Sequence, residues 1–180
     1  SSIAQAGFIL VGLMGKPDMG MATMIYFVLI YVFTNLAAFG VVAAVYNASG
    51  VETIKGYNGL YHTNPKLSLL MMLALFSLAG IPPVAGFFGK FFLFTSAAGT
   101  GYYILVLLAV LNATVSLYYY LLVVRSMFIE KNDHPVAFFK SSVMMRISLV
   151  ICLAGIVIVG FASGIFEELL SISGGLSILP

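Results

Sequence analysis

One lysine, Lys90, has the chemistry and the surroundings that proton transfer inside a membrane would need. It stands in a long apolar run, and no other residue between Lys66 and Arg125 carries a formal charge. An ionisable side chain near the bilayer centre costs roughly 2.5–3.5 kcal/mol on insertion scales, so it marks a functional site by default. A buried lysine can also give up its proton. We therefore predict that Lys90 moves protons or ions; the alternative is that its ammonium only reaches out to the headgroups.

The adjacent prolines Pro82 and Pro83 predict a break in the helix that carries this lysine. They remove two backbone donors, and the first disfavours helix at Ile81. In lipid, the backbone groups that a break frees must find partners inside the protein or in a water-filled cavity. A broken helix beside an ionisable group is also how many transporters build an ion site at mid-membrane.

Other polar residues inside the apolar runs could continue a path for protons to or from Lys90. Several of them recur at helical spacing and so share a helix face. Such residues also often do no more than hydrogen-bond one helix to another. The tyrosine run 118–120 fits an aromatic belt at the membrane surface better than chemistry. The candidate hydrophilic path consists of Gln5, Asn35, Asn112, Ser116 and Tyr119.

The elements that must position these residues are membrane-spanning helices. Of the 180 residues, 62% are hydrophobic and 8% are charged, and the mean hydropathy is +1.12. This composition indicates an integral membrane protein. The net charge of +2 and the lack of a basic cluster argue against nucleic acid as a partner. The single cysteine, Cys152, excludes an intrachain disulfide, and no metal-ligand spacing is present.

We predict an all-α integral membrane bundle of about five transmembrane helices, one of them broken at Pro82-Pro83. The first apolar run is shorter than the ~20 residues that span a bilayer. The chain, residues 1–180, is therefore expected to be the C-terminal part of a larger domain. The five expected spans are approximately 1–15, 21–48, 67–98, 102–127 and 144–166.

The charges of the loops predict how these spans are oriented. If the spans alternate in direction, the loops after the second and fourth spans lie on one side, and the other side carries only Lys16. Cytoplasmic loops are enriched in Lys and Arg, so the two polar loops are expected in the cytoplasm and the C-terminus in the other compartment. The basic residues of these two loops are Lys55, Lys66, Arg125, Lys131, Lys140 and Arg146.

Five short motifs, in order and at their spacing, resemble the C-terminal half of the subunit N family of bacterial NADH–quinone oxidoreductase, respiratory complex I. The resemblance runs from Ser1 to about Ile129, and beyond that point only hydropathy agrees. The sister subunits L and M carry a lysine on the preceding helix, at the place where this chain has the neutral residues Thr34-Asn35. This difference favours the subunit N family over its sisters. The motifs are Ser1-Ser2-Ile3-Ala4-Gln5-Ala6-Gly7, Gly59-Leu60-Tyr61, Leu78-Ala79-Gly80-Ile81-Pro82-Pro83, Gly86-Phe87-Phe88-Gly89-Lys90-Phe91 and Ser116-Leu117-Tyr118-Tyr119-Tyr120.

The resemblance implies a fourteen-helix antiporter-like fold of two inverted repeats, of which this chain would hold the last five helices. It implies that Lys90 is the ionisable group of the second half-channel, which opens towards the periplasm. Many relatives have His where this chain has Gln5, so a protonatable relay is not expected there. The implied location is the bacterial inner membrane, with the C-terminus in the periplasm.

The resemblance also implies cofactors and partners outside this chain. NADH, FMN, the Fe–S clusters and quinone would bind other subunits, and no cofactor is expected here. The expected partners are the lipid bilayer and other membrane-arm subunits of complex I, especially the antiporter-like subunit M and the small subunits A, J and K. The expected function is proton translocation coupled to electron transfer from NADH to quinone.

Three other functions fit the same residues. A subunit of a multi-subunit cation/proton antiporter shares the expected fold. The equivalent subunit of the photosynthetic complex shares the motif from Gly86 to Lys90. A purely structural spacer would use the broken helix only for packing, and a dry environment around Lys90 would favour it.

Overall fold

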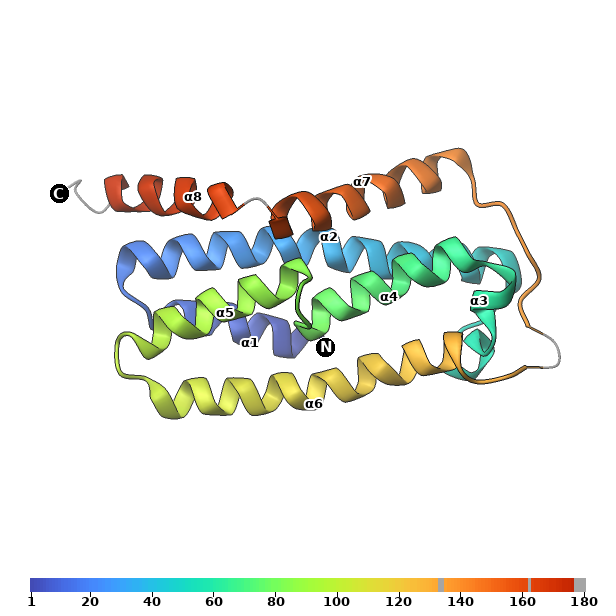
Figure 1. The fold of residues 1–180 in the computed structure, drawn as a ribbon, viewed down its shortest axis with the longest axis horizontal. Coiled ribbons are helices and arrows are strands. Elements are labelled where there is room, and N and C mark those ends of the chain that lie inside the picture. The colour runs from blue at the N-terminus through green and yellow to red at the C-terminus, as the bar shows by residue number, and fades with distance from the viewer. Residues whose placement is uncertain (133–134, 162, 177–180) are drawn as a thin grey trace.

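The computed structural model describes residues 1–132, 135–161 and 163–176, and in these ranges it is a bundle of helices. The helices run side by side along the long axis of the molecule (Figure 1). The all-α fold predicted from the composition is confirmed. The elements are α1 Ser2–Gly12, α2 Pro17–Ser49, the 3-10 helix η1 Ile54–Tyr57, α3 Leu60–Thr63, α4 Pro65–Ala79, α5 Ala85–Ala98, α6 Tyr103–Phe128, α7 Val143–Phe161 and α8 Ser163–Leu176.

Local sequence signals set the ends of the long helix α2. Pro17 opens the helix, where its missing N–H costs nothing, and Asp18 lies in the positive first turn. Gly50 closes it in a left-handed conformation with φ of 69°, and its N–H bonds to the carbonyl of Tyr46. At ~1.5 Å per residue, its 33 residues exceed the ~30 Å hydrocarbon core. The helix must tilt or protrude to span a membrane.

The predicted break at Pro82-Pro83 is confirmed. Helix α4 ends at Ala79 and helix α5 begins at Ala85, and the two halves lie end to end in the middle of the bundle (Figure 1). The peptide bond between the two prolines is cis. Among the described helices, the three long and apolar enough to cross a membrane alone are α2, α6 and residues 143–160 of α7. The halves α4 and α5 are shorter, so they cross only as a pair.

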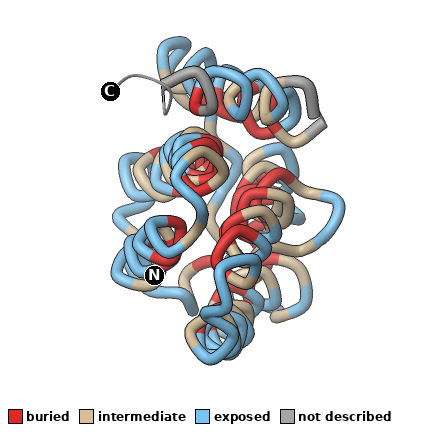
Figure 2. The backbone as a smooth tube through the Cα atoms, turned by 90° about the vertical axis from the view of Figure 1, so that its left-hand side faces the viewer, coloured by how far each residue is buried: buried red, intermediate tan, exposed pale blue. Residues whose placement is uncertain are grey.

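Helix α2 is the centre of the bundle. It contacts α1, α4, α5, α7 and α8, whereas α6 contacts α1, α4 and α5 on the other side. Viewed along the helices, buried residues face the interior and exposed ones the outside (Figure 2). Many exposed side chains are large and apolar, such as Ile104 on α6, which is 78% exposed. Such a surface suits lipid or neighbouring subunits better than water.

The last expected span, 144–166, covers α7 and the beginning of α8, and helix α8 continues well beyond it to Leu176. Helix α8 packs along α2. The ring of Phe166 stacks on that of Phe92 in α5 at a centroid distance of 4.1 Å. Glu167 and Glu168, which directly follow the expected span 144–166, are exposed within this helix.

The two polar loops lie at the same end of the bundle and are bonded to each other. The Ser126 hydroxyl at the end of α6 donates to the Ile54 carbonyl at 2.6 Å. The Asn64 amide donates to the Ala137 carbonyl at 3.2 Å. These contacts agree with the expectation that the spans alternate in direction, which places the two polar loops on the same side.

Candidate functional site

The end of helix α4 is a Schellman motif that leaves two backbone carbonyls without partners in its own backbone. Gly80 adopts φ of 84°, and its N–H donates to the Ser77 carbonyl at 3.1 Å. The N–H of Ile81 donates to the Phe76 carbonyl at 3.0 Å. The last four carbonyls of a helix lack intrahelical donors, so those of Leu78 and Ala79 remain open to side chains.

Lys90 supplies donors to both open carbonyls. Its Nζ donates to the Leu78 carbonyl at 2.8 Å and to the Ala79 carbonyl at 3.1 Å, and the side chain is only 5% exposed. Nζ also lies 4.9 Å from the centroid of the Phe8 ring, within reach of a cation–π contact. The ammonium therefore sits at the negative end of the α4 dipole, which favours a positive charge there.

Two features favour glycine at position 80. Its positive φ is strained for other residues. A Cβ atom built there would also lie 3.0 Å from Cδ of Lys90. The turn at Gly80 therefore leaves the carbonyls of Leu78 and Ala79 without backbone partners and also leaves room for the side chain of Lys90.

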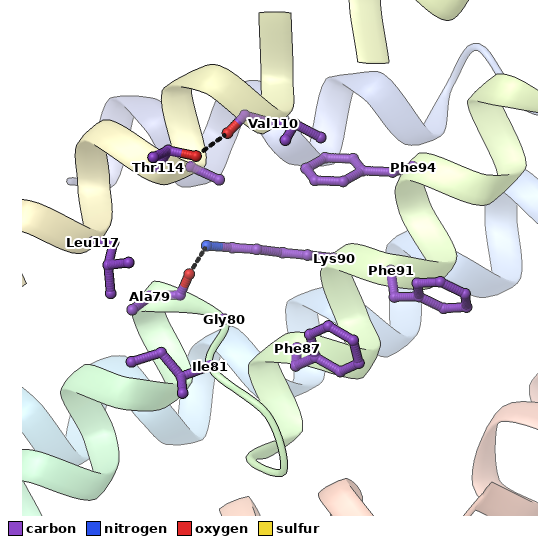
Figure 3. Close-up of a pocket in the computed structure, with 11 residues that line it drawn as sticks. Ala79, Gly80, Ile81, Phe87, Lys90, Phe91, Phe94, Val110, Thr114 and Leu117 are labelled. Carbon is purple, nitrogen blue, oxygen red and sulfur yellow. Dashed lines mark hydrogen bonds between the residues drawn. The ribbon is translucent and has the colours of Figure 1, made fainter. Parts of the chain in front are cut away.

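A cavity of about 260 Å³, open to the outer surface of the bundle, lies beside the Lys90 side chain, between α5, α6 and the break (Figure 3). Its walls are mainly apolar, with Lys90 and Thr114 as the polar side chains, and the Thr114 hydroxyl donates to the Val110 carbonyl at 3.0 Å. The cavity is wide enough for several water molecules. It is lined by Ala79, Gly80, Ile81, Phe87, Lys90, Phe91, Phe94, Val110, Ala113, Thr114 and Leu117.

Gln5 and Lys90 both donate hydrogen bonds to the Leu78 carbonyl. The Gln5 side chain is 1% exposed, and its Nε2 donates to the Leu78 carbonyl at 3.1 Å. The same Nε2 is 3.3 Å from the hydroxyl of Tyr120 on α6, which also hydrogen-bonds to the Ser1 hydroxyl. A polar chain therefore runs from Lys90 through one backbone carbonyl to α1 and α6.

A second polar group holds the two halves of the broken helix together. The Ser77 hydroxyl of α4 accepts a hydrogen bond from the Gly86 N–H of α5 at 3.1 Å. It also bonds to the hydroxyl of Thr34 on α2 at 3.1 Å. The Thr34 hydroxyl donates its own proton to the Ile30 carbonyl at 2.7 Å, so Ser77 must be the donor to Thr34.

The remaining residues of the candidate path show no hydrogen bond to Lys90 in the described structure. On α6 the Ser116 hydroxyl donates to the backbone carbonyl of Asn112 at 2.9 Å, and the Tyr119 hydroxyl donates to Ser116 at 2.9 Å. The Asn112 side chain is exposed. The side chain of Asn35 is half-buried and shows no hydrogen bond within the described ranges. Only Gln5 of the candidate path shares an acceptor with the lysine.

Sequence patterning missed Ser77 and misplaced Tyr120. The tyrosine run favoured an interfacial belt, which fits Tyr118, 67% exposed, but Tyr120 is 5% exposed and faces Gln5. The correction follows from helix geometry, because neighbouring residues on a helix point to different sides. For Ser77, the signal was its place three residues before the glycine that ends α4. No group of His, Cys, Asp or Glu in the described part of the chain could hold a metal ion.

Comparison with known proteins places this geometry in a family. Residues 1–117 match the family model described as "NADH:quinone oxidoreductase/Mrp antiporter, TM". The NADH-quinone oxidoreductase subunit N of Phocaeicola vulgatus is 48% identical over 170 residues, which cover 94% of this chain and 36% of the relative. That of Azobacteroides pseudotrichonymphae is 52% identical over 178 residues, which cover 97% of this chain and 37% of the relative. The chain thus spans little more than a third of these relatives.

A solved structure has the same fold. A chain of respiratory complex I from Thermus thermophilus with bound aureothin superposes with a TM-score of 0.77 at 29% identity, covering 93% of this chain and 38% of that one. The antiporter-like arrangement of helices expected from the sequence is therefore confirmed.

Proposed function

The chain belongs to the NADH:quinone oxidoreductase/Mrp antiporter transmembrane family, and on this basis we propose that it is the C-terminal part of a proton-translocating membrane subunit of complex I. The observation that carries the proposal is the position of Lys90. Its Nζ is bonded to the two open carbonyls at the end of α4. Figure 3 shows the bond to Ala79 and the cavity beside the side chain. In this proposal Lys90 loads and releases the proton, while electron transfer from NADH to quinone takes place in other subunits.

The geometry supports this role because opposing effects act on the ammonium. Burial among apolar side chains penalises the charged form, whereas the two carbonyls and the end of the helix dipole stabilise it. A change in hydration of the cavity, or of a charge nearby, can then shift the balance. Moving one proton against 100 mV costs about 2.3 kcal/mol, and a change of about two pKa units, at 1.36 kcal/mol each, supplies that much.

The proposal extends to location and partners. It places the chain in the bacterial inner membrane, with the two polar loops in the cytoplasm and the C-terminus in the periplasm. The excess of Lys and Arg in these loops supports this orientation. The exposed apolar side chains of α6 and α7 suit lipid and the neighbouring membrane-arm subunits, among which we expect subunits M, A, J and K. NADH, FMN, Fe–S clusters and quinone would be held elsewhere in the complex.

Replacing Lys90 in the full-length subunit of the assembled complex tests the proposal. We expect Lys90→Met to leave assembly intact and to lower NADH-driven proton pumping about a hundredfold, the lower end of what a positioned proton-transfer group contributes. Lys90→Arg should keep the charge but still pump poorly, since a guanidinium does not release its proton. Pumping is measured in reconstituted vesicles with a pH-sensitive dye.

The control is Lys66→Met, which removes an exposed lysine at the start of α4 and should pump like the native protein. Normal pumping by Lys90→Met would overturn the role of Lys90. The family also includes Mrp-type antiporters, which are the second candidate. Cation-driven proton exchange that needs no NADH would favour that function.

A further inference from the structure

We propose that Ser77 is a positioning residue for Lys90, because its hydroxyl fixes the start of α5 against the end of α4. This inference rests on the proposed function only for the consequence in pumping. The positional claim itself concerns the geometry of the break.

Ser77 caps a helix other than its own. The residue at the N-cap of α5 is Val84, whose side chain has no oxygen, and α5 has no cap from its own sequence. An N-cap oxygen normally accepts the N–H of the second or third residue of a helix. The Ser77 hydroxyl does this from α4, since it accepts the N–H of Gly86, the second residue of α5, at 3.1 Å.

The contact between the two half-helices at Ser77 leaves no room for adjustment. A Cβ atom built on Gly86 would lie 1.8 Å from the backbone carbonyl oxygen of Ser77. The Ser77 hydroxyl is also tied to α2, because it donates to Thr34. One side chain therefore links α4, α5 and α2 at a point that is 1% exposed.

The hydrogen bond between Ser77 and Gly86 influences the position of Lys90 because the two residues of α5, Gly86 and Lys90, are one helical turn apart. Lys90 follows Gly86 by four residues and so lies on the same face of α5, one turn further along. The carbonyl that Lys90 reaches at 2.8 Å belongs to Leu78, the residue next to Ser77. Fixing Gly86 against Ser77 thus fixes the distance between Nζ and its acceptors. Without the hydroxyl, the Gly86 N–H would be left buried and unpaired, and the two halves could slide.

A matched pair of substitutions tests the role of the hydroxyl. Ser77→Thr keeps it, and Ser77→Val has the same shape as threonine without it, so any crowding by the added methyl groups is nearly equal in the two. Both are made in the full-length subunit of the assembled complex. We expect protons pumped per NADH oxidised to be about fivefold lower in Ser77→Val than in Ser77→Thr, the effect of losing one hydrogen bond to a buried amide.

The matched control is Ser68 on the same helix. It is fully buried, but its hydroxyl donates only to the Asn64 carbonyl one turn back. Ser68→Thr and Ser68→Val should therefore pump alike. Where Lys90→Met lowers pumping, equal pumping by the two Ser77 variants would overturn the inference. An equal difference at Ser68 would overturn it as well.

A second measurement reports position without relying on pumping. The rate at which a membrane-permeant amine reagent modifies Lys90, followed by mass spectrometry, should be about fivefold higher in Ser77→Val than in Ser77→Thr, since a looser lysine leaves its carbonyls more often. Equal rates would contradict the positional claim. If Lys90→Met pumps normally while the rates differ, the proposed function fails and the positioning role stands.

A third variant covers the case in which the larger side chains prevent assembly. Ser77→Ala adds no atoms and is compared with Ser68→Ala. The same fivefold loss of pumping is expected in Ser77→Ala alone. Where Lys90→Met lowers pumping, equal pumping by Ser77→Ala and Ser68→Ala would overturn the inference. Failure of Ser77→Ala alone to assemble would also overturn it, because Ser77 would then be needed for the fold as a whole.

Discussion

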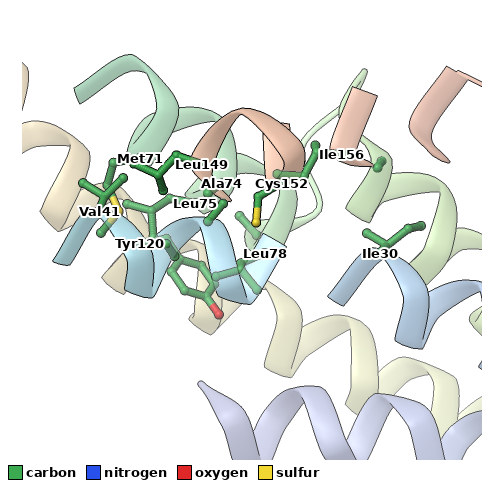
Figure 4. Packing of buried hydrophobic residues seen from close by; sticks show 14 of the residues in the cluster. Ile30, Val41, Met71, Ala74, Leu75, Leu78, Tyr120, Leu149, Cys152 and Ile156 are labelled. Carbon is green, nitrogen blue, oxygen red and sulfur yellow. The ribbon is translucent and has the colours of Figure 1, made fainter. Parts of the chain in front are cut away.

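Two regions of the interior, a few turns apart, are built on opposite principles. Around the break, polar side chains such as Lys90, Gln5 and Ser77 meet backbone groups that an interrupted helix leaves open. Where α2, α4 and α7 pack as continuous helices, the interface is apolar and includes Val41, Leu149 and others (Figure 4). The difference shows why polar residues gather around the break. The backbone groups at helix ends need hydrogen-bond partners, whereas a continuous helix satisfies its own backbone.

The largest expected effect comes from crowding the break. Gly86→Ala would place a Cβ atom 1.8 Å from the carbonyl oxygen of Ser77, and neither backbone can move away without opening the other contacts. We expect a loss of stability of about 3 kcal/mol or more. The measurement is the amount of assembled subunit and the temperature at which the purified complex loses activity.

Gly155→Ala is the counterpart in the apolar interface. Its added Cβ would lie 2.5 Å from the ring of Phe33, so a side chain and not a backbone must shift. The expected cost is about 1 kcal/mol. Equal losses at the two glycines would mean that backbone contact at the break has no special importance.

A cavity in the apolar interface should lower stability but leave transport alone. Leu149 on α7 is 5% exposed and packs over α2 near Gly40 (Figure 4). In lipid, packing contacts supply most of the attraction between helices, so Leu149→Ala should cost about 2 kcal/mol or more. Protons pumped per NADH should stay at the native value in complexes that assemble. A fall in this ratio would show that the two regions are coupled.

The smallest expected effect separates Gln5 from Asn35, another amide of the candidate path. Gln5→Leu removes the donor to Leu78 and Tyr120, at a cost of about 1 kcal/mol, while the Leu78 carbonyl keeps Lys90 as its partner. Pumping should fall, but less than in Lys90→Met. Asn35→Leu, at a side chain without hydrogen bonds to the described residues, should change neither quantity. A larger effect at Asn35 than at Gln5 would place the path along α2.

Much of the fold was predictable because its signals are local. Hydropathy identified the long apolar helices, and Pro82-Pro83 identified the break, since a proline cannot continue the hydrogen bonding of a helix. Lys90 stood out in the sequence because it is the one charged residue between Lys66 and Arg125. Its role, and that of the candidate path, stay predictions.

The sequence by itself determined that a membrane helix must be interrupted and that one charge must lie near the interruption. Only the tertiary structure decided which side chains hydrogen-bond to the backbone groups that the break leaves without partners. A serine or tyrosine in a helix can bond to its own helix, a neighbour or nothing, so Ser77 and Tyr120 could not be assigned from spacing. Their partners come from α5 and from α1, and the separation between helices that pack is set by all their side chains together.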